Sequence, residues 1–430
     1  MIPGACRATV LVIGARGFLG SCIAAHLRER GYRVLAGVRS PESGSDEERR
    51  CDLSRMMVPE QWDDALQEVD VVVNAAGILR ERGAQTFDAV HVRGPVALAQ
   101  ACVGRGVRRF VQVSALGDPR DGEFIASKHR FDAALLEMPL SAVVLRPSVV
   151  HAAEGSYGGS SLLRALAALP CGVWLPGDGH WLLQPLDARD LAELVVRAVE
   201  SDVGGMFEAG GPSPVSLRGY LQQWRKWLRV PGTRVREVPT WLVSLAAAIA
   251  EHLGRGPLGA TMWRMLRRGN VTAPYAPKRV EAAFGFAPRA LAESLLLHPA
   301  RVQDRWHARL YFLAPLLRAA LAGLWLLSGL AGLLAGNTDI AAVTGAALPA
   351  LPALALARSA AVVDLVLAVW LASGWRTRWA LAGMAASVVV YTIAFSLWLP
   401  AAWLAPLGGL AKNIVVLPAI AVLWVLDDRR

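Results

Sequence analysis

Residues 9–20 read TVLVIGARGFLG, and this stretch decides the fold. A short run of aliphatic and β-branched residues comes first, and Gly14, Gly17 and Gly20 then follow with GxxGxxG spacing. An amphipathic helix and a second strand, at 32–38, are expected next. Glycines at these positions allow a tight turn and let a pyrophosphate approach the helix N-terminus, whose free N–H groups favour negative charge. The order strand, glycine turn, helix, strand predicts a dinucleotide-binding unit.

Polar residues follow the later strands of the expected sheet at their carboxyl ends. The pair Asp52-Leu53 follows the third strand, where an aspartate can accept a hydrogen bond from an adenine amine. Open parallel sheets bind their ligands at this edge, so we expect the site there. The other contributing segments are Asn74-Ala75-Ala76-Gly77 after the run 69–73, Ser114 after 110–113, and Arg146-Pro147-Ser148 after 142–145.

These motifs together resemble the extended and atypical branches of the short-chain dehydrogenase/reductase superfamily. The similarity covers about residues 8–295 and includes LPGDG at 175–179, which resembles the start of the substrate region. It is greatest to the atypical group that contains the nucleotide-binding accessory subunit of respiratory complex I and NmrA-like proteins. The resemblance implies an α/β Rossmann-type, doubly wound parallel sheet with a small substrate subdomain.

The end of the second strand predicts which nucleotide is bound. NAD-selective sites place an acid there to hold the ribose 2′-hydroxyl, but this chain has Gly37-Val-Arg39-Ser40. Arg39 and Arg16 can together hold a 2′-phosphate, or they are solvated surface arginines. We expect NADP(H) rather than NAD(H). The expected nucleotide-binding residues are Gly14, Arg16, Gly17, Phe18, Leu19, Gly20, Arg39, Asp52, Leu53, Ala75, Ala76, Gly77, Lys128 and Pro147.

The resemblance implies a catalytic Tyr-x-x-x-Lys pair with an upstream serine, and this chain lacks the tyrosine. Ser114 and Lys128 match the serine and the lysine, while Phe124 stands four residues before Lys128. None of the six tyrosines has a lysine four residues later. A positioned general acid contributes about 10²–10⁴ in rate. Ordinary carbonyl reduction is therefore in doubt, although Lys128 remains the expected ribose-binding cation.

Three other side chains are candidate replacements for the missing acid. His129 is adjacent to Lys128 but about 100° away around a helix. His91 stands where relatives carry an asparagine, and a structural hydrogen bond is the plainer interpretation. Tyr157 lies in a glycine-rich stretch, 155–159, that can close over a substrate.

The final 120 residues are apolar enough to cross a membrane. Residues 319–338 and 379–411 contain no charge over twenty and thirty-three positions, and about 20 apolar residues span a bilayer core. We expect an all-α bundle of four transmembrane helices. We place them at about 316–336, 354–374, 379–399 and 408–426, within the three domains 1–150 (nucleotide-binding), 151–300 (substrate region) and 301–430 (membrane).

Arginines cluster before the first span, after the second and after the fourth. The positive-inside rule then predicts that both termini and the nucleotide-binding domain are cytoplasmic. The N-terminus reads as a strand rather than as a signal peptide. The expected location is the plasma membrane or inner membrane of the cell.

Four ionisable residues lie in or near the spans: Arg318, Arg358, Asp364 and Lys412. Such residues are costly in lipid and often mark function. We expect Arg318 to pair with Asp364, either as a packing ion pair or as a site for a proton or small redox molecule. Arg358 is expected to extend toward the headgroups.

The membrane region resembles the DoxX-like four-helix family over about residues 312–428. The residues that carry this resemblance are Arg318, Leu324-Trp-Leu-Leu-Ser-Gly329, Asp364, Tyr391-Thr392 and Pro406-Leu-Gly-Gly-Leu-Ala-Lys-Asn413. The resemblance says little about activity.

The segment 239–299 joins the two halves and has two interpretations. Residues 241–253 form an apolar helix and 262–268 are basic and aromatic, so the segment either lies on lipid headgroups or, more plainly, completes the substrate region.

Composition excludes some classes of function. The net charge of +10 is spread thinly, and no basic run is interleaved with aromatics, so we expect no nucleic-acid partner. The five cysteines contain no CxxC pair, which favours reduced structural thiols and no metal site.

Two functions fit these features. The first is a membrane-tethered oxidoreductase that transfers hydride to or from a lipophilic carbonyl or quinone-like substrate. The alternative is a non-catalytic NAD(P)H-binding sensor or assembly factor coupled to the membrane domain. Phe124 favours the alternative, whereas Ser114 and Lys128 favour the enzyme.

Overall fold

The computed structural model describes residues 7–232, 234–252, 259–344, 350–404 and 410–427. The chain forms two compact units, Met1–Ala308 and Arg309–Arg430. Each is described separately below.

The first unit is built on a seven-stranded sheet in which all neighbouring strands are parallel. Its strand order is β11-β6-β5-β4-β1-β2-β3. The order reverses between β1 and β4, which places a topological switch point beside the glycine loop. The strands are β1 (Arg7–Ile13), β2 (Tyr32–Val38), β3 (Glu48–Arg50), β4 (Val71–Asn74), β5 (Arg109–Val113), β6 (Ala142–Pro147) and β11 (Gly205–Ala209).

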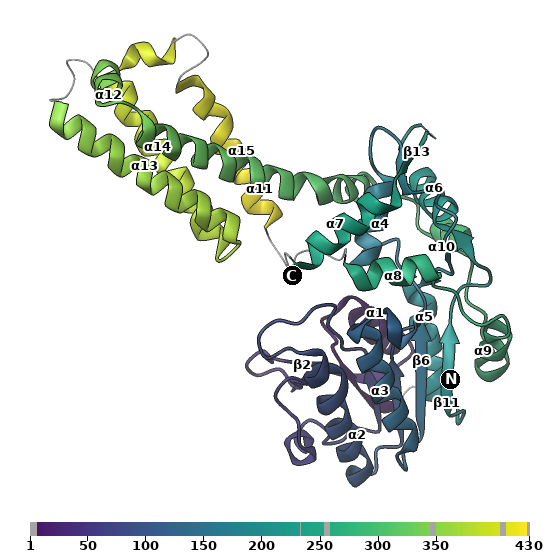
Figure 1. The fold of residues 1–430 in the computed structure, drawn as a ribbon. Helices are drawn as coiled ribbons and strands as arrows, with labels where there is room; N and C mark the ends of the chain where they lie inside the picture. The colour runs from purple at the N-terminus through teal and green to yellow at the C-terminus, as the bar shows by residue number, and fades with distance from the viewer. Residues whose placement is uncertain (1–6, 233, 253–258, 345–349, 405–409, 428–430) are drawn as a thin grey trace. The chain divides into compact units, whose positions relative to one another are not determined.

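Helices cover both faces of this sheet (Figure 1). On one face α1 (Phe18–Glu29) and α5 (Ala188–Glu200) bury residues such as Ile23 and Leu194 against β1 and β4. On the other, α2 (Gly94–Arg105) and α3 (Glu123–Glu137) bury residues such as Leu98 and Phe131. The expected α/β doubly wound sheet is confirmed.

A smaller subdomain follows the sixth strand and packs around Tyr220, Trp224 and Leu175. The chain then returns to the main sheet at β11. The strands of this region are β7 (Val150–His151), β8 (Val173–Pro176), β9 (Leu182–Leu183), β10 (Leu186–Asp187), β12 (Val215–Ser216) and β13 (Val235–Val238). The helices are α4 (Gly159–Ala167), α6 (Leu217–Trp227), α7 (Thr240–His252), α8 (Ala260–Arg268) and α10 (Leu291–Leu297). The remaining helix, α9 (Ala276–Phe284), packs against β11 of the main sheet.

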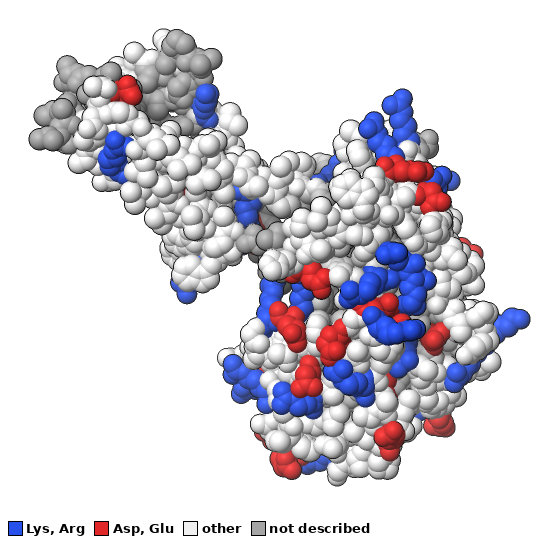
Figure 2. Space-filling model, viewed as in Figure 1, with Lys and Arg blue, Asp and Glu red and all other residues white. Residues whose placement is uncertain are grey.

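The second unit is a helical bundle with a small apolar core that includes Leu321, Trp325, Leu371 and Met384. Many of its apolar side chains are exposed, and the face seen in Figure 2 is mostly uncharged with a few charged side chains. The helices are α11 (Val302–Leu334, which begins in the first unit), α12 (Asn337–Thr344), α13 (Ala350–Ser373), α14 (Thr377–Trp398) and α15 (Asn413–Leu426).

Three of these helices are long and apolar enough to cross a membrane: Val302–Leu334, Pro352–Ser373 and Thr377–Trp398. The apolar segment Leu410–Leu426 is shorter. At 1.5 Å per residue, the 14 residues of α15 rise about 21 Å, less than the roughly 30 Å of a bilayer core. The expected fourth span begins at 408, which lies outside the described residues. The first half of the Pro406–Asn413 motif, residues 406–409, lies outside them too.

The cysteines of the described residues are free thiols: Cys22, Cys51, Cys102 and Cys171. Burial raises the pKa of both Cys51 and Cys102 to about 12. These two side chains therefore behave as small core hydrophobes. Cys6 lies outside the described residues.

Candidate functional site

The glycine loop has the geometry that a bound pyrophosphate needs. Gly14 has a φ of +78°, and a Cβ there would lie 2.9 Å from Ala76 Cα. A Cβ on Gly20 would lie 2.1 Å from the Gly14 carbonyl oxygen. Gly17 N–H donates to that same carbonyl (2.8 Å), and α1 begins directly afterwards. Only glycines allow this close turn, which leaves the start of α1 open to an anion.

The segment after β4 lies against this loop. Asn74 is buried and holds the strand end in place, because its Nδ2 donates to Gln112 Oε1 (2.8 Å) and its Oδ1 accepts from Ala76 N–H (3.2 Å). A Cβ on Gly77 would lie 3.2 Å from Lys128 Nζ. Gly77 therefore leaves room for the lysine at the strand ends.

Lys128 reaches from α3 to the carboxyl end of β5. Its Nζ donates to the Val113 carbonyl at 3.3 Å, and the residue is 6% exposed. Burial lowers the pKa of Lys128 from 10.5 to about 8, and nearby Asp132 opposes the shift. A buried cation at this edge can hold a ribose hydroxyl, the role that the resemblance implies.

Asp132 is the site residue that sequence reasoning missed. It is 1% exposed, and its Oδ2 accepts from Ser114 Oγ (2.7 Å) and from Arg146 Nε (2.8 Å). Its Oδ1 is buried and has no hydrogen-bond partner among the residues that the structure describes. Ser114 therefore commits its proton to Asp132. The spacing Lys128-x-x-x-Asp132 could have indicated Asp132, because residues four apart on a helix lie on the same face and Asp132 therefore lies on the face of Lys128.

Phe124 belongs to an aromatic cluster. Its ring meets the edge of His91 at 5.7 Å and of Phe87 at 6.3 Å between centroids. The position of the usual tyrosine is thus packed with rings that carry no hydroxyl.

His91 has both of its ring nitrogens hydrogen-bonded. Nε2 accepts from Ile78 N–H (3.0 Å), so Nδ1 carries the proton toward Ser127 Oγ (2.9 Å). Burial lowers the pKa of His91 far below its ordinary value. His91 is therefore a neutral structural residue, on a π-helical turn, η2 (Asp88–Arg93), that leads into α2.

The other two candidate acids lie apart from this cluster. His129 Nε2 contacts the Ala115 carbonyl at 3.0 Å, and burial lowers the pKa of its ring. Tyr157 is 63% exposed. Gly155, in the same loop, lies close to Phe18, because a Cβ added to Gly155 would be 3.5 Å from the Phe18 ring. This loop approaches the start of α1, while the Tyr157 side chain is directed to solvent.

The two arginines of the expected phosphate cradle differ in their partners. Arg16 donates to Glu48 (2.7 Å) and to Glu42 (3.0 Å). Neither contact was predicted from the sequence. Arg39 is exposed at the end of β2. Asp52 follows β3 and accepts from Ser54 N–H (3.0 Å) and Oγ (2.6 Å).

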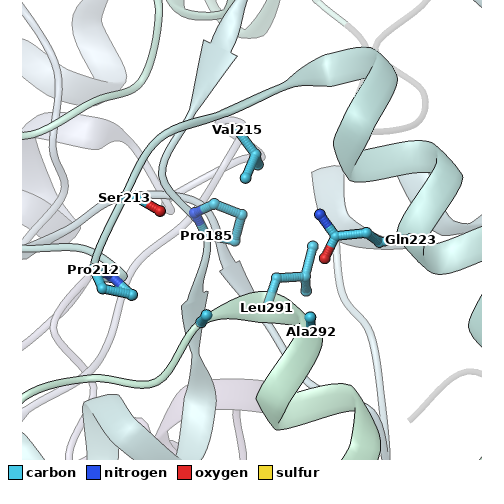
Figure 3. A pocket seen from close by; sticks show the side chains of 8 residues that line it. Pro185, Pro212, Ser213, Val215, Gln223, Leu291 and Ala292 are labelled. Carbon is cyan, nitrogen blue, oxygen red and sulfur yellow. The ribbon is translucent and has the colours of Figure 1, made fainter.

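A pocket in the substrate subdomain is lined by Pro185, Pro212, Ser213, Val215, Gln223, Ala290, Leu291 and Ala292 (Figure 3). Its polar groups are the Ser213 hydroxyl and the Gln223 amide, and none of the eight lining residues is charged. We therefore place the candidate site at the strand ends, where the buried charges lie.

In the second unit, the expected pairing of Arg318 with Asp364 is wrong. Arg318 forms an ion pair with Asp427, at the end of α15. Asp364 accepts from Ser328 Oγ (2.7 Å) and from Tyr391 Oη (3.4 Å) instead. Ser328 is ten residues beyond Arg318 on α11, about 15 Å along the axis, so Asp364 is beyond the reach of Arg318.

Arg358 donates to carbonyls at the end of α11, those of Gly332 (2.8 Å) and Ala335 (2.9 Å). Helix C-termini carry free carbonyls and partial negative charge, so Arg358 caps α11. Lys412 is exposed.

Comparison with known families matches each unit to one family. Residues 10–210 match the NAD dependent epimerase/dehydratase family, and residues 322–424 match the DoxX-like family. The chain thus carries an epimerase- and short-chain-dehydrogenase-like NAD(P)-binding domain followed by a DoxX-like domain. Both resemblances are confirmed.

Three relatives share the first unit. A ceramide reductase of Caulobacter vibrioides is 28% identical over 34% of this chain and 47% of that protein. The mitochondrial NADH dehydrogenase [ubiquinone] 1 alpha subcomplex subunit 9 of Mus musculus is 29% identical over 47% of this chain and 56% of that protein. The chain spans about half the length of these two. A 3-diazoavenalumate denitrifying reductase of Streptomyces sp is 26% identical over 65% of this chain and 95% of that protein.

Among solved structures, human epimerase family protein SDR39U1 with NADPH has a TM-score of 0.52 and 21% identity. The match covers 67% of this chain and 97% of that chain. It supports the fold of the first unit.

Proposed function

We propose that this protein is a membrane-tethered, NADP(H)-binding oxidoreductase that acts on a lipophilic carbonyl or quinone-like substrate without the usual catalytic tyrosine. The observation that carries the proposal is Lys128, buried at the carboxyl ends of β4 and β5 within reach of Gly77 and the Val113 carbonyl. A buried cation beside an anion-binding glycine loop suits a nucleotide better than it suits a structural role.

When bound, the nicotinamide supplies the hydride. In this proposal the glycine loop, residues 14–20, holds the pyrophosphate and Lys128 holds the ribose. Ser114 is oriented by its hydrogen bond to Asp132 and presents its oxygen lone pairs to the site. The other nucleotide contacts are the residues expected from the sequence: Arg39, Asp52, Leu53, Ala75, Ala76 and Pro147. Phe124 offers no proton, which favours an acceptor such as a quinone over a simple ketone.

The preference for NADP(H) over NAD(H) rests on Arg39 and Arg16. Both lie beside the end of β2, where the ribose 2′-substituent of the nucleotide binds in this fold. Arg16 would exchange its contacts with Glu42 and Glu48 for a phosphate, whereas exposed Arg39 would gain one. Arg39 is therefore the stronger determinant of the preference.

The membrane part of the proposal has four spans. The three long apolar helices and the shorter segment Leu410–Leu426 support this count. The arginine distribution supports cytoplasmic termini and a cytoplasmic nucleotide-binding domain, in the plasma or inner membrane. A lipophilic substrate would then reach the protein from the bilayer.

The aromatic cluster around Phe124 favours a second candidate, a non-catalytic NAD(P)H-binding sensor or assembly factor. Phe87, His91 and Phe124 fill the position of the proton donor with mutually packed rings. Nucleotide binding needs none of these side chains to transfer a proton.

One experiment separates the two candidates. The full-length protein is purified in detergent, its bound nucleotide is identified, and NADPH oxidation is followed with short-chain quinones and hydrophobic aldehydes. Turnover that Lys128→Ala abolishes and that the exposed-site control Lys278→Ala retains supports the oxidoreductase. Tight NADPH binding without turnover on any acceptor contradicts it and supports the sensor.

A further inference from the structure

We propose that α7 is an interfacial helix that lies on the lipid bilayer through one exposed apolar face. This face consists of Trp241, Leu242, Leu245 and Ile249. The inference rests on the membrane tether of the proposed function and is independent of its chemistry.

The four side chains lie on the same side of the helix. At 100° per residue, positions 241, 245, 249 and 242 fall at about 0°, 40°, 80° and 100° around the axis. They therefore occupy one arc of about 100°, which also contains His252, the last residue of the helix, at about 20°. An arc this wide is what a helix normally buries against a protein core.

In this structure the arc is not buried. Trp241 is 64% exposed, Leu245 51% and Ile249 50%. The buried residue of α7 is Ala247, at about 240° on the opposite side. Ala246 and Ala248 are exposed as well, so the first unit covers little of α7 and leaves its largest apolar side chains free to contact a second apolar phase.

The opposite side of α7 is already occupied by protein contacts. Ser244 Oγ accepts from Trp263 Nε1 of α8 (2.9 Å), Glu251 accepts from Ala260 N–H (2.9 Å), and Arg80 donates to the Ala250 carbonyl (3.1 Å). These contacts determine the rotation of the helix about its axis. The apolar face is therefore held outward by hydrogen bonds and is not simply loosely packed.

Basic residues flank the helix in sequence and in space. Residues 234–268 contain six arginines and two glutamates. Figure 2 shows basic side chains over α8, both basic and acidic side chains near β13, and an uncharged surface over α7 between them. An apolar face with a Trp near one end and arginines beside it matches an anionic lipid surface.

A bilayer is also the partner that is always present. The chain enters a charge-free stretch at residue 319, so the tether raises the effective concentration of a membrane for every surface of the first unit. Weak lipid contact then suffices for occupancy, whereas a second copy or another protein would need a complementary surface.

The test is hydroxyl-radical footprinting of the full-length protein, read residue by residue with mass spectrometry. The protein is compared in nanodiscs containing anionic lipid and in an amphipathic polymer that coats the spans without providing a bilayer surface. The readout is the ratio of oxidation at Trp241 to oxidation at Tyr275, which is 66% exposed in the same unit. We expect this ratio to be at least threefold lower in nanodiscs.

Equal ratios in the two preparations would overturn the proposal. A low ratio in both preparations would mean that protein covers the face. A ratio that falls only when two copies share a disc would mean that a second copy covers it. Either result would also contradict the proposal. NADPH binding is measured on the same samples, so that loss of the proposed function is seen separately.

Variants make the assignment specific. The double substitution Leu245→Asp with Ile249→Asp should restore Trp241 oxidation in nanodiscs, while buried Trp263 stays protected as a check on folding. The matched control is Leu296→Asp with Leu297→Asp on α10, which are 81% and 56% exposed. This control should leave the Trp241 ratio unchanged.

Discussion

Two buried carboxyls, Asp132 in the first unit and Asp364 in the second, are compensated in opposite ways. In the nucleotide-binding unit, Asp132 accepts from Arg146 and Ser114, and Lys128 lies on the same helix one turn before it. In the membrane unit, Asp364 accepts only hydroxyl hydrogen bonds among the described residues, from Ser328 and Tyr391. One carboxyl is compensated by charge and the other by neutral donors.

The difference follows from what surrounds each site. A buried ion pair needs partners with good geometry to offset desolvation, and the strand ends of a Rossmann sheet bring such partners together from several elements. A lone carboxylate among transmembrane helices is costly, and hydroxyl donors suit the neutral acid equally well. The same substitution in the two places should therefore have very different effects.

The largest effect is expected for Asp132→Asn. Removing its charge leaves Arg146 without its buried partner, which costs about 3 kcal/mol of unfolding free energy. Denaturant unfolding of the first unit, followed by tryptophan fluorescence, measures it. Asp64→Asn, at an exposed position, is the control. A loss below about 1 kcal/mol would mean that charge compensation does not distinguish the two units.

Next is Lys128→Met, which removes the buried cation. A hydrogen bond to a charged group contributes about 1.5–3 kcal/mol, so NADPH affinity should fall roughly 10- to 100-fold. Isothermal titration of the full-length protein measures this, with Lys278→Met as the control. Unchanged affinity would show that Lys128 only compensates Asp132.

Arg39→Ala should reduce the preference for NADPH over NADH about tenfold, because a charge-assisted contact to the 2′-phosphate is lost. Arg33→Ala, an exposed arginine on the same strand, should have no effect. The ratio of the two dissociation constants is the measurement. A preserved ratio contradicts NADP(H) selectivity through Arg39.

The pH dependence of binding sharpens the role of Lys128. Because its pKa is lowered to about 8, the ammonium loses its proton as pH rises through that value, and NADPH affinity should fall several-fold between pH 7 and 9. The free energy of unfolding of the ligand-free first unit should instead increase with pH. The unfolded chain binds this proton up to about 10.5, so stability rises from pH 8 to 10.5. Both trends should vanish in Lys128→Met.

The smallest effect is expected for Asp364→Asn. An amide oxygen can still accept from Ser328, so the thermal unfolding of the membrane unit should change by less than about 1 kcal/mol. A loss comparable to that of Asp132→Asn would show that Asp364 carries a charge, and would remove the contrast between the two units.

Local pattern was sufficient for much of this protein. The TVLVIGARGFLG stretch predicted the turn that Gly14 and Gly20 make possible, and the absence of charge predicted the apolar helices. Lys128 was found because Phe124 and Lys128 keep a spacing of four. Each of these features depends on neighbours within a few residues along the chain.

Asp132 and the Arg318–Asp364 expectation show the limit of such patterns. The spacing of four places Asp132 on the same helix face as Lys128, but it does not predict that β5 and β6 bring Ser114 and Arg146 to Asp132. Asp364 and Arg318 have complementary charges, but α13 packs with Asp364 against Ser328, which lies about 15 Å along α11 from Arg318. Contact between helices depends on their relative register along the axis.

The sequence by itself thus determined the two kinds of unit, the glycine loop, the lost tyrosine at Phe124 and the apolar character of α7. Only the tertiary structure decided which charges meet and which face of α7 remains outside. Composition and periodicity predict which side of a segment is apolar, because they depend on the chemistry of single residues. Whether that apolar side is buried depends on how segments distant in the chain pack against it.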